Sequence, residues 1–280
     1  MSDARWRLLR DGAARGDWNM AVDEALLEAV LSGGLPTLRF YDWQPACLSL
    51  GYFQRFEVVD PAGCRAQGVD IVRRPTGGRA ILHDRELTYS LSLPAAALGH
   101  DAGVLPSYHR ISRALQAGLA SAGVDATMAS ESAAPTTADH GPICFDRPSA
   151  HEILLDGRKL VGSAQVRRGN ALLQHGSIVI EPQTERMLAC LANHKSTGPR
   201  DPDLRSRVAG LSEVGLIDRD QLAGAMTAAF EREFGVECIP GRLTPAEAGE
   251  ATRLVTAKYG TPSWTERPLL EAAINTTRTR

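Results

Sequence analysis

A chain of 280 residues can bury a substantial core and can hold one large catalytic domain with a small appendage. Its formal net charge of -2 and pI near 6.4 provide no basic field, which argues against nucleic acid or an anionic membrane as a partner. The five cysteines are scattered without a C-x-x-C pair, and no apolar run reaches the roughly 18 residues that cross a bilayer, so we expect a cytoplasmic protein with reduced thiols and neither a disulfide framework nor a metal site.

The first 70 residues alternate between strand and helix patterns. Trp6–Asp11 is typical of a strand, and the helix after it can be capped by Asp17 or Asn19 and ended by Gly33-Gly34. The apolar positions of this helix recur at helical spacing, at Met20, Leu26, Leu27, Val30 and Leu31. Two strands, a helix and a third strand are then predicted at Thr37–Trp43, Cys47–Tyr52, Asp60–Gly68 and Asp70–Arg73.

A glycine-containing motif, RRPTGGRAILHDRELTYSLSL, runs from Arg73 to Leu93. Gly77-Gly78 supplies backbone without side chains, and the two arginines before it place guanidinium groups at the mouth of the loop. Such a loop could hold the thioester end of an acyl chain or a phosphate, but it could also be a simple β-turn beside a solvated Arg pair. Ala80–Leu82 and Leu87–Leu93 indicate a strand pair around His83-Asp84.

A helix is predicted at Tyr108–Ala122, followed by a surface loop, Ala126–Pro142, rich in Ala, Ser, Thr and Pro. The next segment is typical of a β-meander. Its three strands and two turns are predicted at Glu152–Asp156, Asp156-Gly157, Arg158–Arg168, Gly169-Asn170 and Ala171–Ile180. The last strand is so apolar that we expect it in the interior of a sheet, with His175 as a core histidine.

Two reactive side chains flank the first strand of this meander. Cys144 precedes it and Lys159 follows its tight turn, so the thiol and the ammonium can approach one another. A nearby cation favours the thiolate, which is the nucleophilic form of cysteine. The amides of Gly162-Ser163-Ala164 could hold an oxyanion. The alternatives are that Cys144 is a small buried hydrophobe and that Lys159 is a solvated strand charge.

The last third of the chain is mainly helical. A helix at Thr184–Ala192 leads into a polar connector, His194–Asp203. After Asp218 an apolar stripe predicts a helix through Leu222, Met226, Ala229, Phe230 and Phe234. Val236–Ile239 is extended, Thr244–Tyr259 forms a helix with Glu247 at the capping-box position, and a polar tail follows Arg267.

The run CFDRPSAHEILLDGRKLVGSAQ, followed by LLQHGSI, resembles the biotin/lipoate protein ligase superfamily, and within it the cysteine-dependent octanoyltransferases of the LipM type. The resemblance implies that Cys144 carries an acyl group as a thioester and that Lys159 tunes it. It further implies that the cavity wall includes Gly162, Ser163, Ala164, His175 and Gly176. His151 departs from the family pattern, where a Tyr is expected.

The motif from Arg73 to Leu93 is similar to an RR-x-x-GG-x-A-x-x-HD element of the same superfamily, which lines the acyl pocket. The residues carried over as pocket residues are Arg73, Arg74, Gly77, Gly78 and His83. ATP-using lipoate ligases have a third Gly and a Gly-Asn here. Arg79 and Glu86-Leu87-Thr88 stand in their places, which favours the transferase group.

We therefore expect an α+β fold, with a largely antiparallel or mixed central sheet flanked by helices, like the catalytic domain of class II aminoacyl-tRNA synthetases and biotin/lipoate ligases. The expected organisation is a catalytic domain at 1–215, a small C-terminal α/β cap at 216–267 that packs on it, and a polar tail at 268–280. The cap is expected to be mainly helical. The superfamily resemblance supplies this specific architecture.

The resemblance implies an octanoyltransferase without a cofactor, which moves octanoyl from octanoyl-acyl carrier protein to Cys144 and then to a lysine of a lipoyl domain such as the glycine-cleavage H protein. A close alternative is an octanoyl-H-protein amidotransferase. Two other classes are an ATP-dependent lipoate-protein ligase and a non-catalytic binder of lipoyl domains or acyl carriers. The sequence leaves open the preferred acyl length, the acceptor, the oligomeric state and any use of free lipoate.

Overall fold

The computed structural model describes residues 4–98, 103–129, 152–192, 204–215 and 218–267. Several predictions fall outside these residues. They concern Cys144, His151, the greater part of the loop Ala126–Pro142, the connector His194–Asp203 and the tail 268–280.

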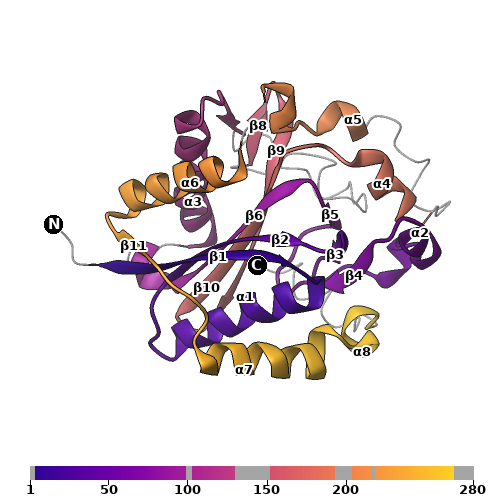
Figure 1. The fold of residues 1–280 in the computed structure, drawn as a ribbon, viewed down its shortest axis with the longest axis horizontal. Coiled ribbons are helices and arrows are strands. Elements are labelled where there is room, and N and C mark those ends of the chain that lie inside the picture. Colours follow the sequence, from indigo (N-terminus) through magenta and orange to yellow (C-terminus); the bar gives the residue numbers. More distant parts are fainter. Residues whose placement is uncertain (1–3, 99–102, 130–151, 193–203, 216–217, 268–280) are drawn as a thin grey trace.

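An eight-stranded mixed sheet forms the centre of the described structure, in the order β11-β1-β2-β6-β10-β9-β8-β7 (Figure 1). Its strands are β1 (Arg5–Ala14), β2 (Thr37–Trp43), β6 (Glu86–Pro94), β7 (Thr127–Met128), β8 (Ile153–Leu155), β9 (Arg158–Arg168), β10 (Ala171–Val179) and β11 (Glu237–Pro240). β1 runs parallel to its neighbours β2 and β11, and the other pairs are antiparallel. The predicted mixed α+β architecture is confirmed.

A second sheet of three strands lies beside the first, in the order β4-β3-β5. Its strands are β3 (Cys47–Leu50), β4 (Asp70–Arg73) and β5 (Ile81–His83). The predicted pairing of Ala80–Leu82 with Leu87–Leu93 is wrong, because β5 pairs with β3 while β6 pairs with β2 and β10. The chain changes sheets after His83, since the apolar side chains before and after this point enter two separate cores.

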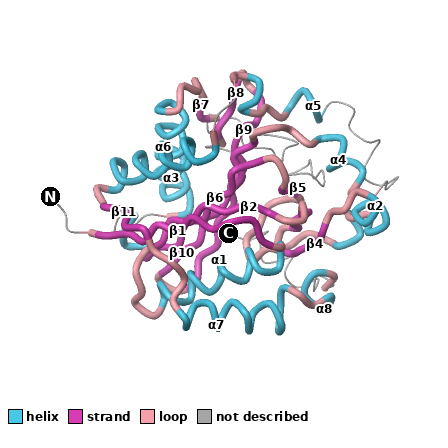
Figure 2. The backbone as a smooth tube through the Cα atoms, viewed as in Figure 1, coloured by secondary structure: helices cyan, strands magenta, loops and turns pink. Residues whose placement is uncertain are grey.

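Helices cover both faces of the large sheet (Figure 2). Their bounds are α1 (Gly16–Leu31), α2 (Pro61–Ala66), α3 (Val104–Ser121), α4 (Thr184–Ala189), α5 (Leu204–Arg207), α6 (Arg219–Phe234), α7 (Pro245–Leu254) and α8 (Pro262–Thr265). α3 and α6 pack together on one face, α1 and α7 on the other, and α2 and α4 close the small sheet. Among the described helices, none has the length and apolar character to span a membrane.

Strand β6 shows how the sequence divides the two faces. Its odd-numbered residues from Leu87 to Leu93 are apolar and enter the core under α3 and α6. The residues between them, Thr88, Ser90 and Ser92, are small and polar and are also buried. Because successive strand side chains alternate between faces, β6 presents hydroxyl groups to the α1 side of the sheet.

The start of α1 differs from the prediction. Neither Asp17 nor Asn19 is the N-cap, because the helix begins at Gly16 after an extended Arg15. Asn19 instead is buried and donates to the backbone carbonyl oxygen of Asp42 at 2.9 Å. A Cβ atom on Gly16 would lie 2.4 Å from the Sγ of Cys47, so the packing of β3 against the helix start selects this residue.

The meander is confirmed, with β8, β9 and β10 as consecutive antiparallel neighbours. Asp156 and Gly157 have φ values of 49° and 74°, which is the combination that a tight two-residue hairpin of this kind requires. β10 lies between β6 and β9 and is an interior strand, as its apolar sequence predicted. The turn therefore fixes the position of Lys159, two residues after Gly157.

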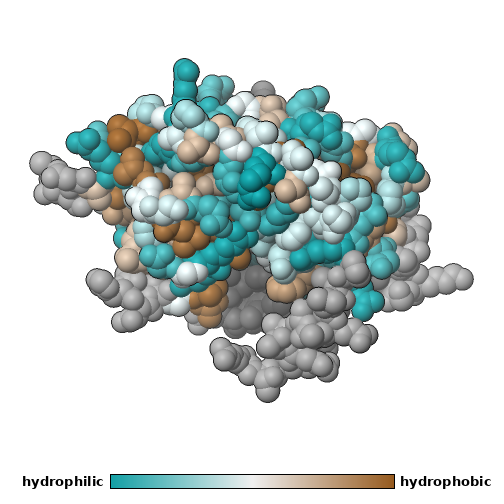
Figure 3. All heavy atoms as spheres, turned by 90° about the horizontal axis from the view of Figure 1, so that it is seen from below, coloured by the Kyte–Doolittle hydropathy of each residue, from teal (hydrophilic) through white to brown (hydrophobic). Residues whose placement is uncertain are grey.

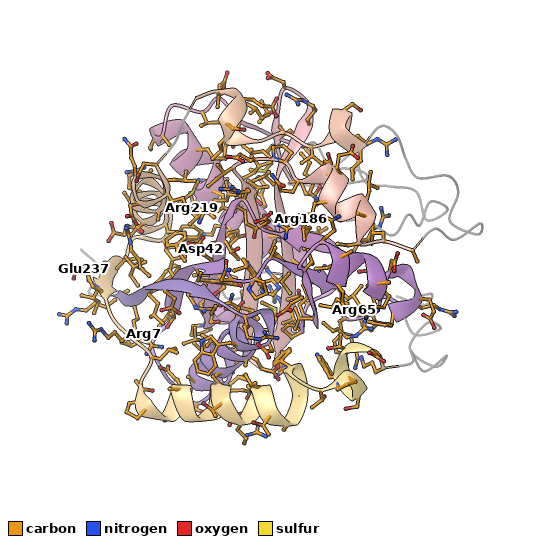
Figure 4. The ribbon with its side chains drawn as sticks, turned by 45° about the vertical axis from the view of Figure 1, so that its right-hand side comes forward. Arg7, Asp42, Arg65, Arg186, Arg219 and Glu237 are labelled. Atoms are coloured by element: carbon orange, nitrogen blue, oxygen red, sulfur yellow. The ribbon has the colours of Figure 1, made fainter. Side chains whose placement is uncertain are left out.

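The C-terminal segment contributes to the main layers. β11 adds an edge strand beside β1, and the side chain of Thr244 caps α7 by accepting from the backbone N–H of Glu247, as predicted. Arg7 of β1 forms two hydrogen bonds with the carboxylate of Glu247, and Arg219 of α6 lies 2.7 Å from Asp42 (Figure 4). The division between 1–215 and 216–267 remains a prediction.

The surface seen from the side of α7 is mainly hydrophilic, and its hydrophobic side chains gather in small separate patches (Figure 3). Five large apolar side chains in the described part of the chain are exposed: Leu35, Phe53, Val104, Leu105 and Val214. Single exposed apolar residues are normal for a folded protein and carry no functional meaning by themselves.

We predict that Phe230→Ala destabilises the protein by about 3–5 kcal/mol, because this fully buried ring joins α6 to Tyr89 of the sheet and to Phe234. The measurement is the free energy of unfolding from urea titration. Phe53→Ala is the matched control, since this ring is 59% exposed, and it should change stability by less than about 0.5 kcal/mol. Equal losses in the two variants would contradict the packing described here.

Candidate functional site

A partly open cavity, with about 380 Å³ of empty space including its solvent-facing mouth, lies between α1 and strands of the two sheets. Its lining residues are Met20, Tyr41, Trp43, Arg74, Ile81, His83, Thr88, Gly162, Ser163, Ala164, His175, Gly176 and Ser177. Most of these side chains are apolar or aromatic, with a few polar groups between them. This combination is typical of sites that bind small molecules or acyl chains.

Seven of the predicted pocket residues line this cavity: Arg74, His83, Gly162, Ser163, Ala164, His175 and Gly176. Arg73, Gly77 and Gly78 do not line it. Sequence reasoning missed the remaining lining residues, which are Met20, Tyr41, Trp43, Ile81, Thr88 and Ser177. Segments more than 150 residues apart in the sequence thus converge on one site.

Arg73 is completely buried and is not at the mouth of a loop. Its guanidinium donates to backbone carbonyl oxygens of Gly51 at 2.9 Å, Gln54 at 2.6 Å and Thr265 at 2.9 Å. Burial, together with the neighbouring Arg267 and Arg74 cations, lowers the pKa of Arg73 to about 10. The residue joins the loop after β3 to α8, so its observed contacts are structural.

Arg74 is also buried, but its guanidinium borders the cavity. It donates to the carbonyl oxygen of Gly77 at 2.8 Å and to the hydroxyl of Ser49 at 3.1 Å. Gly78 has φ of +88°, and a Cβ atom there would come within 2.8 Å of the Arg74 guanidinium and 4.0 Å of the Cβ of Ala164. The loop therefore needs glycine here in order to approach both Arg74 and strand β9.

His83 is held on all sides. Its Nδ1 donates to the carboxylate of Glu86 at 2.7 Å, and its Nε2 lies 2.8 Å from the hydroxyl of Ser49. Its ring stacks on Trp43 with 4.0 Å between the centroids. Glu86 also accepts from Thr88 and Ser177. Both ring nitrogens are thus engaged, and the imidazole lines the cavity together with Trp43.

His175, on β10 of the large sheet, is held in the same manner. Its Nδ1 donates to Asp23 at 2.9 Å, and its Nε2 lies 2.7 Å from the hydroxyl of Thr76 in the glycine-containing loop. Burial, with the nearby Arg74 and His83, lowers the pKa of His175 even though Asp23 acts in the opposite direction. The ring is therefore neutral, and it is a core histidine, as predicted, that also lines the cavity.

Asp23 is the centre of a fully buried polar network below the cavity. Besides His175, its carboxylate accepts from Arg39 at 2.9 Å, Tyr41 at 2.9 Å and Ser90 at 2.8 Å. Burial alone would raise the pKa of Asp23, but these hydrogen bonds and the Arg39 cation lower it. An ionised Asp23 consequently joins α1, β2, β6 and β10 at one point.

Lys159 and Glu152 form a second buried ion pair. Nζ of Lys159 lies 2.6 Å from Oε1 of Glu152, and the two side chains are only 1% and 4% exposed. The prediction named Lys159 but missed Glu152. Removing one member of such a pair is strongly destabilising, by about 3–5 kcal/mol, because it leaves a buried charge alone.

A bulge in β9 decides where Lys159 points. The pairing with β8 shifts by one residue between Val161 and Lys159, and both Leu160 and Val161 enter the main core. Because alternation is interrupted at this point, Lys159 lies on the same face of β9 as Gly162 and Ala164, which line the cavity. Lys159 is not itself a lining residue, but it lies next along the strand on that face.

The chemistry of the described site follows from these contacts. The cavity is partly open and its surface is mainly apolar, and its two imidazoles can act as bases only by giving up existing hydrogen bonds. Gly162–Ala164 form strand pairs with β10. The pairing of β9 with β8 ends before them, at Val161. Within the described part of the chain, no group of three or more His, Cys, Asp or Glu side chains could hold a metal ion.

The model of the lipoyl protein ligase A/B catalytic domain matches residues 16–231. An octanoyltransferase LipM from Moorella thermoacetica is 42% identical over 274 residues, which cover 94% of this chain and 98% of the relative. Another from Symbiobacterium thermophilum is 39% identical over 274 residues, which cover 95% of this chain and 99% of the relative.

The fold is similar to that of solved lipoate protein ligases. A structure of a bi-partite lipoate protein ligase and its E2 lipoyl domain from Thermoplasma acidophilum superposes with a TM-score of 0.78. The sequence identity is 24%, and the match covers 95% of this chain and 98% of the other. At this identity the likeness establishes the fold.

We predict that acid weakens the fold through His175. The unfolded chain binds a proton at this residue near pH 6.5, whereas the native state does not, so stability falls as the pH drops below about 6.5. The expected contribution is up to about 1.4 kcal/mol per pH unit. Urea unfolding between pH 8 and pH 5.5 measures it.

The variant His175→Gln should lose this part of the pH dependence. His109→Gln, which removes an exposed histidine from α3, is the matched control. A pH dependence of the free energy of unfolding that is identical in wild type and His175→Gln would contradict the assignment of a neutral, buried imidazole.

Proposed function

This chain belongs to the family of the lipoyl protein ligase A/B catalytic domain, and from that membership we infer that it is an acyltransferase that transfers octanoyl groups in protein lipoylation. The observation that carries this function is identity of about 40% with octanoyltransferases over nearly the whole length of both chains. The mainly apolar cavity supports it, because an octanoyl chain needs a site that shields methylene groups from water.

An octanoyltransferase of lipoylation needs an acyl donor and a lipoyl-domain acceptor. We propose octanoyl-acyl carrier protein as the donor and the glycine-cleavage H protein as the acceptor. Both substrates present a reactive group on a long flexible arm, a thioester or a lysine side chain. A narrow cavity beside a glycine-containing loop suits such arms, since the backbone near Gly77 leaves open space.

The proposed nucleophile is Cys144, which lies outside the described residues. Its thiolate attacks the carbonyl carbon of the donor thioester, and the tetrahedral oxyanion collapses with release of the carrier thiol. The neutral amine of the acceptor lysine then attacks the Cys144 thioester, an amide forms, and the thiol is regenerated with the proton lost by the amine. No bond to a nucleotide is made or broken in this sequence.

The proposed roles of the described residues follow their positions. Gly162, Ser163 and Ala164 are the candidate donors for the oxyanion. They line the cavity, and they lie beyond Val161, the last residue of β9 that pairs with β8. His83, His175 and Gly176 form the wall of the acyl cavity. Arg73, Gly77 and Gly78 support that wall through the loop after β4, and Arg74 joins the loop to the cavity.

The contacts of Glu86 support a transferase rather than an ATP-dependent ligase. This buried residue lies where the ligases have Gly-Asn, and its carboxylate is held by His83, Thr88 and Ser177. A carboxylate directly behind three residues that line the cavity disfavours the phosphate oxygens of a nucleotide there. We further propose a cytoplasmic location, since the cysteines in the described part of the chain are free thiols.

We predict that the protein takes up one octanoyl group from octanoyl-acyl carrier protein without ATP or magnesium. Intact-mass measurement should detect an adduct that hydroxylamine removes, because a thioester is labile to this nucleophile. Cys144→Ala should form no adduct and remain folded. The matched control is Cys238→Ala, which removes a partly exposed thiol and should keep the adduct.

Two results would overturn this assignment. One is modification of the acceptor at the normal rate by Cys144→Ala, which would exclude the covalent route through this thiol. The other is transfer that fails with octanoyl-acyl carrier protein but succeeds with free octanoate and ATP, which would place the protein among the ligases.

We predict that Lys159 promotes the thiolate of Cys144. A cation within a few ångströms lowers the pKa of a thiol by about one to three units, so Lys159→Ala should raise the pH at which iodoacetamide alkylates Cys144 by that amount. Lys159→Arg should restore it only in part, because the planar guanidinium needs more room. An unchanged alkylation profile in Lys159→Ala would remove Lys159 from this role and make His151 the next candidate.

The control for this experiment is Arg158→Ala. Arg158 precedes Lys159 on β9, but its guanidinium is bound to Glu213 at 2.6 Å in a partly exposed pair. Arg158 carries the same charge as Lys159 and is its neighbour on the strand. The variant Arg158→Ala therefore reports any general effect of losing a cation from β9. Circular dichroism and unfolding curves must accompany Lys159→Ala, because this variant leaves Glu152 without its ammonium partner.

A further inference from the structure

Among the residues that the structure describes, Glu152 is the one buried carboxylate on the cavity side of β9. The proposed reaction has so far given it no role. Glu152 directly precedes β8, and its side chain lies against Lys159 and not in the cavity lining. A buried pair of this kind costs desolvation free energy, and an apolar pair of the same volume is often as stable. Stability alone therefore gives little reason for these two charges.

We propose that Glu152 is a positioning residue for octanoyl transfer, which holds Lys159 as a buried ammonium and fixes the direction of its Nζ. This inference rests on the proposed function, because it assigns a role to a neighbour of the lysine that acts in that reaction.

The first step of the argument is electrostatic. Removal from water favours the neutral form of an amine, and the side chain of Lys159 is only 1% exposed. A carboxylate oxygen 2.6 Å from Nζ reverses this preference, because the attraction between the two charges is strong where water is excluded. The carboxylate of Glu152 thus keeps the ammonium charged inside the protein.

The second step concerns geometry. The backbone of Lys159 is fixed at its carbonyl oxygen, which accepts from the N–H of Ala209 at 3.0 Å, and by its pairing with Leu154 of β8. The other end of the side chain is fixed by the hydrogen bond from Nζ to Glu152. With both ends held, the four-carbon chain of Lys159 has little conformational freedom left, and its remaining N–H groups have defined directions.

Two other charged or titratable groups on the strands packed around Lys159 have partners of their own. Arg158 on β9 pairs with Glu213, and His175 on β10 is bound to Asp23. A further cation, Arg207, lies at the end of α5. Glu152 is the anion whose salt bridge with Lys159 is direct, and it is buried as deeply as the lysine. Its replacement should therefore act on Lys159 before it acts on any other charge.

The two possible states of Lys159 give opposite expectations. If the reaction needs the ammonium, Glu152→Gln lowers the pH above which Lys159 loses its proton, and transfer slows near neutral pH. If the reaction needs a neutral amine as a base, the same substitution increases the active fraction and transfer becomes faster. The direction of the change distinguishes the proposal from its opposite.

The experiment compares wild type, Glu152→Gln, Glu152→Asp and Glu213→Gln. Glu213→Gln is the matched control, because it neutralises the carboxylate of the neighbouring, partly exposed pair with Arg158. The first readout is the pH profile of kcat/KM for octanoyl transfer. We expect a loss of about tenfold or more at pH 7 for Glu152→Gln, because a buried lysine without an anionic partner can titrate at about pH 6 or below, partial recovery in Glu152→Asp, and no change in Glu213→Gln.

The second readout does not depend on activity. In protein labelled with ¹⁵N-lysine, the ammonium signal of Lys159, assigned by its absence in Lys159→Met, should persist to higher pH in wild type than in Glu152→Gln. If wild type shows no octanoyl transfer at all, the proposed function fails while this titration still tests the pair. If the ammonium titrates at the same pH in both proteins, the pair does not hold the charge and the inference fails.

Two double variants guard against a purely structural effect. Glu152→Leu combined with Lys159→Met removes both charges and should fold, because apolar residues of similar size can replace a buried pair. If Glu152 acts through Lys159, then Glu152→Gln should have no further effect on the pH profile in a Lys159→Met background. An equal fall in kcat/KM in both backgrounds, with no shift of the profile, would overturn the positioning role.

Discussion

The buried carboxylate of Asp23 is the interaction on which the rest of this structure depends. It lies on α1, yet it accepts hydrogen bonds from two strands of the large sheet and from His175 on a third. Because an ionised carboxylate inside a protein must be compensated, every one of these partners has to occupy its place. The orientation of α1 on the sheet, the tautomer of His175 and the floor of the cavity are thereby set together.

The parts of the fold that local patterns control could be predicted from the sequence. The Asp156-Gly157 turn and the apolar run of β10 specify the meander, because turn chemistry and alternation act over a few residues. The start of α1 was missed because Asn19, a predicted capping residue, is buried in contact with β2, and because the helix begins without a side-chain cap. The second sheet was also missed, since the change of sheet after His83 depends on which core each apolar face enters.

The site was only partly predictable for the same reason. His175 and Gly162–Ala164 were found from the strand pattern together with the resemblance to a family, whereas Asp23 and Glu152 were not found. A signal for Asp23 was present, since it follows Met20 by three residues and precedes Leu27 by four and so lies on the apolar face of its helix. Glu152 gave no such signal, because only the bulge in β9 brings it and Lys159 to one face.

The buried charges around the cavity fall into two kinds, and the difference separates support from chemistry. Arg73 is surrounded by backbone carbonyl oxygens and Arg39 by several partners at once, so their charges are fixed by many contacts and serve the scaffold. The Lys159 ammonium is in direct contact with a carboxylate at 2.6 Å, in a pair of which both side chains are almost completely buried. Electrostatic interactions are strong where water is excluded, so this pair responds to a change in a neighbouring group, such as a thiol that becomes a thiolate. A buried pair of this kind costs desolvation free energy, and this one lies on the strand that borders the reacting site.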